Sequence, residues 1–178
     1  VVYFMERNDN LTNLIDVRHI LIPFEGGKTD STTGDKVYTD AEKNAAKDKA
    51  QHLLDDWLAE KDHDEDSFAD LANKNSKDSD GTDGGLYENV YPGQMVSAFN
   101  DWCFDENRKP GDTGLVETEY GYHVMYFVKT QDISFRDSMI KNALISEDSA
   151  AWMEEISEAV TVTKVNLSGM ETDYVMGY

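Results

Sequence analysis

The sequence predicts an α+β fold in which a small, largely antiparallel sheet is surrounded by helices. Residues 17–22 and 122–129 alternate side chains as strands do. Between them, residues 39–58, 67–75 and 96–103 repeat apolar side chains at helical spacing. The expected order is strand, helix, helix, short strand, helix, strand, strand.

The first predicted strand, residues 17–22, is a β-branched and apolar run with two distinct faces. One face carries Val17, His19 and Leu21, and the other carries Arg18, Ile20 and Ile22. The strand therefore reads as buried. Residues 23–38 after it are rich in Gly, Thr, Asp and Ser, which predicts a long polar loop.

Residues 39–42, Thr-Asp-Ala-Glu, have the form of a capping box and predict the start of a helix of about twenty residues. The acidic stretch 62–66 ends that helix, and a shorter helix follows over residues 67–75. Residues 76–85, rich in Asp and Gly, are expected to form a loop.

The third predicted helix carries an apolar stripe and is stopped by a turn at Pro110 and Gly111. Its stripe consists of Val96, Phe99 and either Trp102 or Cys103. Two strands follow, over residues 113–118 and 122–129. In the second strand, His123, Met125 and Phe127 share one face, opposite Tyr122, Val124, Tyr126 and Val128.

The flanking segments differ in character from the centre and suggest three parts. Residues 1–15 read as a strand and linker belonging to a second domain, 16–131 as the central domain, and 132–178 as further helices and a strand of that second domain. Two amphipathic helices are expected, around 135–144 and 150–159, before a final strand at 161–165. Their apolar face is predicted to pack on the strand at 1–5 or on a second copy of the chain.

Composition excludes some partners and leaves others open. Thirty-six acidic residues against sixteen basic ones give a formal charge of −20, which disfavours binding to nucleic acid or to anionic bilayers. The charge either attracts cationic peptides or only keeps the protein soluble. Cys103 is the one cysteine, so no intrachain disulfide is possible, and it is expected to be a small buried side chain.

A metal site is not expected. Residues 78–84 resemble a calcium loop, but that register places Asp83 where the loop needs glycine and Asn89 where it needs a bidentate glutamate. Signatures of serine triads, of Walker phosphate loops and of dinucleotide sites are also lacking. The sequence therefore predicts no metal and no cofactor.

Two pairs of residues stand out by their positions. His19 and His123 lie in the middle of apolar strand faces, where a polar ring needs a hydrogen-bond partner, and each ring can satisfy the other. They are either part of a site or core histidines kept for structure. Met95 and Phe99, four residues apart at the start of a helix, share a face that is either ordinary core or an adaptable apolar floor.

An ordered set of strings spans residues 16–130: Val17-Arg18-His19-Ile20-Leu21-Ile22, Phe68-Ala69-Asp70-Leu71-Ala72, Gly84-Gly85, Pro92-Gly93-Gln94-Met95, Phe99, and residues 116–124. Together they resemble the parvulin (PpiC-type) family of peptidyl-prolyl cis-trans isomerases. The flanks resemble the extracytoplasmic foldases of Gram-positive bacteria, in which a parvulin domain sits between segments that form a second, chaperone-like domain.

This resemblance implies a parvulin-like fold and a set of site residues. The catalytic group would consist of His19, Asp78, Thr118 and His123. The proline pocket would consist of Tyr87, Met95, Phe99 and Phe104. Tyr87 and Glu88 replace a usual leucine and glycine, which leaves the pocket rim uncertain. The loop after the first strand offers only Lys28 and Lys36 among several acids, so no phosphoserine requirement is expected.

The resemblance also implies a function: rotation of X-Pro bonds in newly exported polypeptides, without covalent catalysis. The alternative is a chaperone module that binds peptides without turnover. The expected location is extracytoplasmic, secreted or on the cell surface, with a membrane anchor outside this sequence. A homodimer is a further possibility.

Overall fold

The computed structural model describes residues 11–78 and 83–159. Its elements in chain order are β1 (Asn13–Pro23), β2 (Lys28–Thr29), β3 (Lys36–Val37), α1 (Asp40–Ala59), α2 (Glu65–Asn75), the 3₁₀ turn η1 (Asp83–Gly85), β4 (Leu86–Val90), α3 (Ser97–Cys103), β5 (Thr113–Thr118), β6 (Gly121–Ser134) and α4 (Phe135–Ala159). This order confirms the predicted α+β class, including the short strand before the third helix, which is β4.

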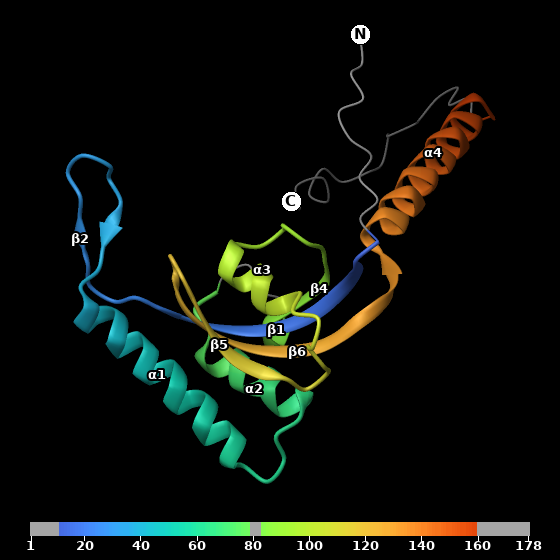
Figure 1. Ribbon diagram of the computed structural model, residues 1–178. Helices are drawn as coiled ribbons and strands as arrows, with labels where there is room; N and C mark the ends of the chain where they lie inside the picture. Colours follow the sequence, from blue (N-terminus) through green and yellow to red (C-terminus); the bar gives the residue numbers. More distant parts are fainter. Residues whose placement is uncertain (1–10, 79–82, 160–178) are drawn as a thin grey trace, which may run out of the picture. The chain divides into compact units, whose positions relative to one another are not determined.

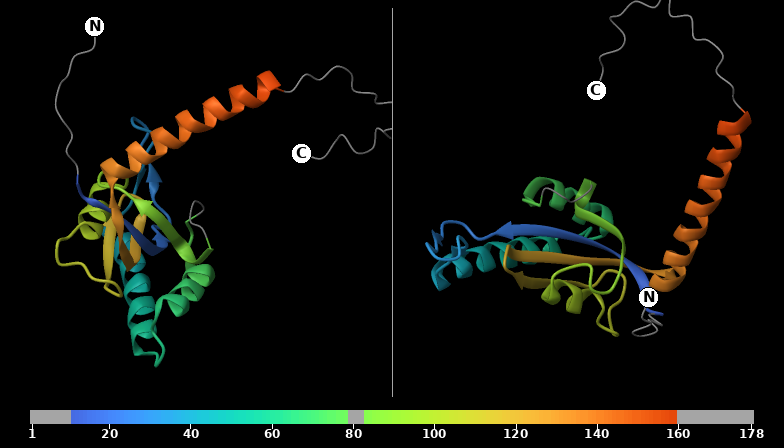
Figure 2. Two further views of the ribbon diagram at one scale, coloured as in Figure 1. Left: turned by 90° about the vertical axis from the view of Figure 1, so that its right-hand side faces the viewer. Right: turned by 90° about the horizontal axis from the view of Figure 1, so that it is seen from above.

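The main sheet has four antiparallel strands in the order β4-β1-β6-β5, with β1 and β6 at its centre (Figure 1). Helices α1 and α2 cover one face of this sheet, and α3 covers the other (Figures 1 and 2). Because strand side chains alternate between faces, β1 and β6 each supply residues to both layers.

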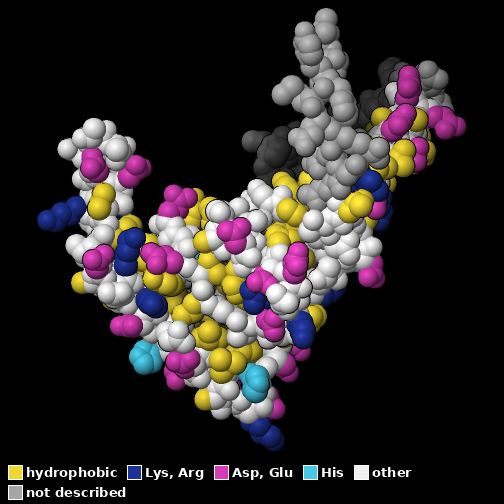
Figure 3. All heavy atoms as spheres, in the orientation of Figure 1, with side chains coloured by type: hydrophobic (Ala, Val, Ile, Leu, Met, Phe, Trp, Pro, Cys, Tyr) yellow, Lys and Arg dark blue, Asp and Glu magenta, His cyan; other side chains and the backbone are white. Residues whose placement is uncertain are grey.

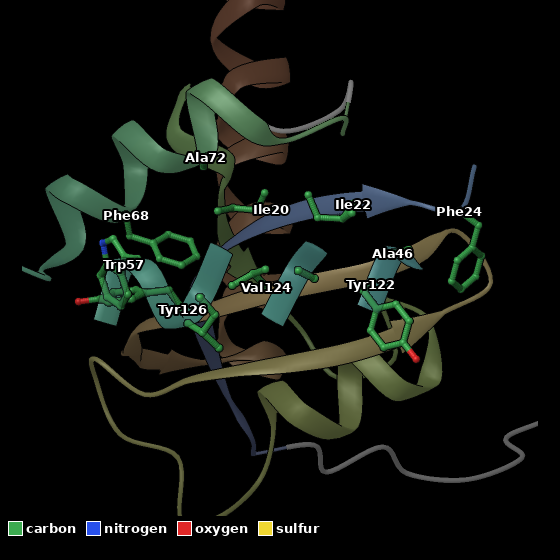
Figure 4. Packing of buried hydrophobic residues seen from close by; sticks show 12 residues of the cluster. Ile20, Ile22, Phe24, Ala46, Trp57, Phe68, Ala72, Tyr122, Val124 and Tyr126 are labelled. Carbon is green, nitrogen blue, oxygen red and sulfur yellow. The ribbon is translucent and has the colours of Figure 1, made fainter. Parts of the chain in front are cut away.

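The face under α1 and α2 is a continuous apolar core (Figure 4). Its buried members are Ile20, Ile22, Phe24, Ala46, Ala50, Leu54, Trp57, Phe68, Ala72, Tyr122, Val124 and Tyr126. Phe68, with no exposed surface, lies between Trp57 and Tyr126, with ring centroids 5.4 Å and 5.1 Å away. These contacts hold both helices against the sheet.

The face under α3 has a second, smaller cluster. Its buried members are Ile15, Val17, Val90, Phe99, Cys103, Val116, Met125 and Phe127. The predicted alternation of both central strands is thereby confirmed, since Val17 and Met125 lie on this face while Ile20 and Val124 lie on the other. His19 and His123 share the face of this second cluster.

Helices α1 and α2 both begin at capping boxes. The one predicted at Thr39 is confirmed: the Thr39 hydroxyl accepts the Glu42 N–H, and the Glu42 carboxylate accepts the Thr39 N–H. Helix α2 begins at Glu65, earlier than predicted, because Asp64 accepts the Ser67 N–H as its N-cap. The acidic stretch therefore starts this helix as well as ending the first, since carboxylates favour a helix N-terminus.

The segment predicted as a plain polar loop, residues 23–38, contains a hairpin of β2 and β3. Its turn is closed by Asp30, whose carboxylate accepts the N–H groups of Thr32 and Thr33, and whose carbonyl accepts the Gly34 N–H. Gly34 has a φ of +81°, which glycine adopts without strain. Two-residue strands are too short for periodicity to reveal.

The prediction of two C-terminal helices is wrong, because α4 is one continuous helix over Phe135–Ala159. Residues 145–150 contain neither proline nor glycine, so nothing in the backbone interrupts the helix there. The chain divides into two compact units, Val1–Ser138 and Met139–Tyr178. The strands predicted at 1–5 and 161–165 lie outside the described residues, and the second, chaperone-like domain stays a prediction.

The visible surface carries acidic side chains scattered among basic ones, without one dominant acidic patch (Figure 3). His52 and His63 are exposed. In the part of α4 whose side chains are described, several large apolar residues are exposed: Met139, Ile140, Leu144, Ile145, Trp152, Met153 and Ile156. Within residues 11–78 and 83–159, no helix is long and apolar enough to cross a bilayer.

Candidate active site

The two central strands bring the histidines together. Leu21 of β1 pairs with His123 of β6, and His19 is two residues from Leu21, so both rings lie on the same face. Their Nδ1 atoms are 3.0 Å apart, and the rings are 4% and 6% exposed. The prediction that each histidine satisfies the other is confirmed.

The histidine pair is part of a longer hydrogen-bonded relay. Thr118 Oγ1 lies 2.8 Å from His123 Nε2, and His19 Nε2 lies 2.9 Å from Asp78 Oδ2. A carboxylate at Asp78 can only accept, so it takes the Nε2–H of His19. The bare Nδ1 of His19 then accepts the Nδ1–H of His123, whose Nε2 accepts the Thr118 hydroxyl proton. With both rings neutral, this proton order gives every member a partner.

Burial and charge together keep the inner histidine neutral. Removal from water and the neighbouring His19 lower the pKa of His123 to about 4, against a smaller opposing effect of Asp78. At neutral pH the His123 ring is therefore an uncharged relay member, donating through one nitrogen and accepting through the other.

Tyr87, a departure from the family pattern, is a member of this group. Its hydroxyl donates to Asp78 Oδ2 at 2.7 Å, and its ring centroid lies 5.1 Å from that of His19. Tyr87 stands on β4, which pairs with β1 at Val17. The phenol thus adds a donor that the usual leucine cannot supply, while Glu88 beside it is exposed and does not line the pocket.

The Gly84-Gly85 turn places β4 close to β1. Gly85 has a φ of +65°, and a Cβ there would collide with the His19 carbonyl oxygen. The turn is held by Arg18, whose guanidinium donates to the carbonyls of Asp83 and Gly84 and pairs with Glu65 at 3.0 Å. The motif glycines therefore set how near Tyr87 approaches the relay.

A pocket of about 450 Å³ opens above the relay. It is lined by His19, Leu21, Lys77, Asp78, Tyr87, Gln94, Met95, Val96, Phe99, Tyr120 and His123. Phe99, 3% exposed, presents its ring at about right angles to both imidazoles, with centroids 5.2 Å and 5.5 Å away. The pocket thus has an apolar wall beside a polar one.

Six of the eight predicted site residues line this pocket: His19, Asp78, Tyr87, Met95, Phe99 and His123. Thr118 lies behind His123 and does not reach the pocket. Phe104 does not line it either, but packs partly buried against the cluster under α3. Met95 precedes the helix instead of opening it, because α3 begins at Ser97.

Five lining residues were not predicted: Leu21, Lys77, Gln94, Val96 and Tyr120. Leu21 shares a strand face with His19, and Lys77, Gln94 and Val96 adjoin predicted members, so position along the chain could have indicated these four. Tyr120 reaches the pocket from the turn between β5 and β6, and it is 59% exposed. A turn residue gives no periodic signal.

In the described ranges, no group of three or more potential ligand side chains is placed to hold a metal ion. Residues 79–82 of the calcium-like segment lie outside those ranges. Cys103 is buried, as predicted, and burial raises the pKa of its thiol to about 12. It is therefore not a nucleophile of this site.

Known proteins resemble this chain in both sequence and fold. Foldase protein PrsA 1 of Listeria innocua is 30% identical over 104 residues, which is 53% of this chain and 35% of that protein. Foldase protein PrsA of Staphylococcus epidermidis is 39% identical over 83 residues, 45% of this chain and 25% of that protein. The matched part thus spans about a third or less of these relatives.

Two solved structures share the fold. A PpiC-type peptidyl-prolyl cis-trans isomerase domain has a TM-score of 0.53 at 16% identity, covering 71% of this chain and 99% of that domain. The PPIase domain of TbPar42 has a TM-score of 0.50 at 23% identity, covering 65% and 99%. The PPIC-type PPIase domain model matches residues 2–131. This chain therefore belongs to the PPIC-type peptidyl-prolyl isomerase family.

Proposed function

We propose that this domain catalyses cis-trans rotation of X-Pro bonds in extended, unphosphorylated polypeptides. The observation that carries the proposal is the hydrogen-bonded relay from Asp78 through the two histidines, lying directly under a pocket walled by Met95 and Phe99. An apolar wall suits a proline ring, and an ordered polar wall suits the amide beside it.

The barrier defines what the site has to do. Rotation breaks amide resonance and faces ~18–20 kcal/mol. A site that accelerates it about 10⁴-fold must bind the twisted amide better than the planar one by ~5.5 kcal/mol. No bond is made or broken, so neither a nucleophile nor a leaving group is required.

Each wall contributes to that preference in a different way. Met95 and Phe99 hold the ring, so that the carbonyl side of the bond rotates against a fixed proline. The planar amide has separated charges because of its resonance, and the twisted amide loses them. The fixed negative charge that Asp78 presents at the pocket therefore interacts differently with the two forms. The buried pair of His19 and His123, of which His123 is neutral, fixes Asp78 in place.

The deciding experiment is an isomerisation assay on unphosphorylated X-Pro tetrapeptides, with Asp78→Ala and Met95→Ala compared to the parent. We expect kcat/KM to fall at least about tenfold in each variant, with the fold retained. Asp70→Ala on α2 and Met139→Ala on α4 are matched controls, since both residues are exposed outside the pocket. Their kcat/KM should equal that of the parent.

An inactive parent would overturn the proposal. If that protein still suppressed aggregation of an unfolded client, the chaperone module without turnover would replace the isomerase. A matched pair of peptides, Ser-Pro and phosphoserine-Pro, tests the expected lack of a phosphate requirement. The two lysines of the hairpin, Lys28 and Lys36, should then give the phosphopeptide no advantage.

We also propose that the domain works outside the cytoplasm, on newly exported proteins, within a longer membrane-anchored foldase that forms a homodimer. The location is supported by the likeness to PrsA foldases, and the dimer by the apolar side chains exposed on α4. Protease accessibility on intact cells tests the location, detergent extraction tests the anchor, and analytical ultracentrifugation tests the dimer. An intracellular, salt-extractable monomer would contradict all three parts.

A further inference from the structure

The segment that carries Asp78 is attached to β1 in an unusual way. Helix α2 ends at Asn75, and the backbone N–H of its C-cap residue Ser76 donates to the Ala72 carbonyl at 2.9 Å. The chain then passes along the edge of β1. There the Lys77 N–H donates to the Leu21 carbonyl at 3.0 Å, and the Leu21 N–H donates to the Ser76 hydroxyl oxygen at 3.1 Å.

Beyond the end of β4, residues 76–77 form the hydrogen bonds at this edge of β1. Strand β4 pairs with β1 from Ile15 to Arg18 and no further. The N–H and carbonyl of Leu21 both go to residues 76–77 instead of to the neighbouring strand β6. One of the two bonds uses a side-chain oxygen where a strand would use a carbonyl, so the segment crosses the edge with only one backbone bond.

The same hydroxyl also reaches the relay. Ser76 Oγ accepts the Asp78 N–H at 3.3 Å as well as the Leu21 N–H. Leu21 and His19 are two residues apart on one strand face. Because the chain just before Asp78 is hydrogen-bonded to Leu21, the Asp78 carboxylate lies over His19. The observed distance of 2.9 Å between Asp78 Oδ2 and His19 Nε2 follows.

We propose that Ser76 is a positioning residue of the isomerase site, acting only through Asp78. Ser76 does not line the pocket, so it does not touch substrate. Its role as the end of α2 uses its backbone N–H, which alanine also has, so the hydroxyl and the helix end can be separated by mutation. The inference rests on the proposed isomerase function.

The test is a double-mutant cycle on kcat/KM for an unphosphorylated Ala-Pro tetrapeptide, with Ser76→Ala, Asp78→Ala and the double variant. Ser76→Ala should lower kcat/KM about tenfold, mainly through kcat. In the Asp78→Ala background it should cost nothing more, because the residue on which it acts is gone. Ser76→Thr, which keeps a hydroxyl, should restore most of the rate.

A matched control lies at the other end of the same helix. The Ser67 hydroxyl also accepts two N–H groups, from Trp57 Nε1 and from the Asp64 backbone, both at 3.0 Å. Ser67→Ala should lower the denaturation midpoint as Ser76→Ala does, yet leave kcat/KM within about twofold of the parent. The pair separates loss of stability from loss of positioning.

A readout independent of turnover is the Nε2–H resonance of His19 in ¹H–¹⁵N spectra of the full chain. It should shift or broaden in Ser76→Ala and stay unchanged in Ser67→Ala. Additive losses in the cycle, parent-like kcat/KM, or an unchanged His19 resonance would overturn the proposal. If Ser76→Ala does not fold, Ser76→Cys takes its place. If the parent shows no isomerase activity, the function fails, while the resonance still decides whether Ser76 positions Asp78.

Discussion

The two faces of the central sheet are built from the same two strands and have opposite characters. The face under α1 and α2 is filled by apolar side chains around Phe68, with aromatic rings in contact. The face under α3 has a smaller apolar cluster, beside four hydrogen-bonded polar groups and an open pocket. The first face stabilises the fold, and the second face carries the candidate site.

The largest expected effect lies on the first face. Phe68→Ala removes a fully buried ring, which typically costs about 3–5 kcal/mol in the free energy of unfolding. Urea denaturation measures this loss, with Phe68→Leu as a milder variant if alanine prevents folding. A fully stable Phe68→Ala protein with impaired turnover would break the division between the two faces.

The next effect is a loss of stability at low pH, which follows from the burial of His123 on the second face. His123 has an ordinary pKa of 6.5, and burial lowers it to about 4 in the folded state. Below pH 6.5, His123 binds a proton in the unfolded chain but not in the folded chain. The free energy of unfolding therefore falls between pH 6.5 and about pH 4, by about 3 kcal/mol in all. Above pH 6.5 this group adds no pH dependence.

The measurement is the free energy of unfolding of the parent and of His123→Gln between pH 7 and pH 4.5. The parent should lose more stability than the variant over this window, because glutamine does not titrate. Carboxylates away from the site are present in both proteins, so their contributions cancel in the difference. Parallel curves would contradict a buried neutral His123.

A smaller effect concerns the helix that covers the apolar face. Thr39→Ala removes the N-cap hydroxyl of α1 and should cost about 1 kcal/mol in unfolding free energy. Because Thr39 lies outside the pocket, the kcat/KM of isomerisation should not change. A fall in kcat/KM without a fall in stability would show that α1 communicates with the site.

The smallest effect is expected at Cys103, which packs under α3 beside the site. Its raised pKa, about 12, leaves almost no thiolate at pH 8, so a maleimide should not label the folded chain within minutes. The urea-unfolded chain should be labelled fully under the same conditions. Rapid labelling without urea would mean that α3 opens from the sheet.

Local sequence signals predicted those parts of the molecule that depend on neighbours along the chain. Strand alternation placed His19 and His123 each on an apolar face of its own strand, and the capping box marked the start of α1. The contact between Tyr87 and Asp78 could not be predicted in this way. It depends on where β4 meets β1 and on how residues 76–78 cross the edge of that strand.

Two elements were mispredicted, each for its own physical reason. The hairpin β2–β3 is made by one Asp30 turn with two residues on each side, too few to show a period. In α4, the two predicted amphipathic segments are joined by residues 145–150, none of which prevents helical geometry.

The adjacency of β1 and β6 has a consequence for how the protein comes into being. His19 and His123 touch although 104 positions separate them in the chain. Contacts this distant in sequence require a long loop to close, which raises contact order and slows folding. During synthesis, the histidine pair can assemble only after β6 has emerged. The candidate active site is therefore complete only after most of the domain has been synthesised.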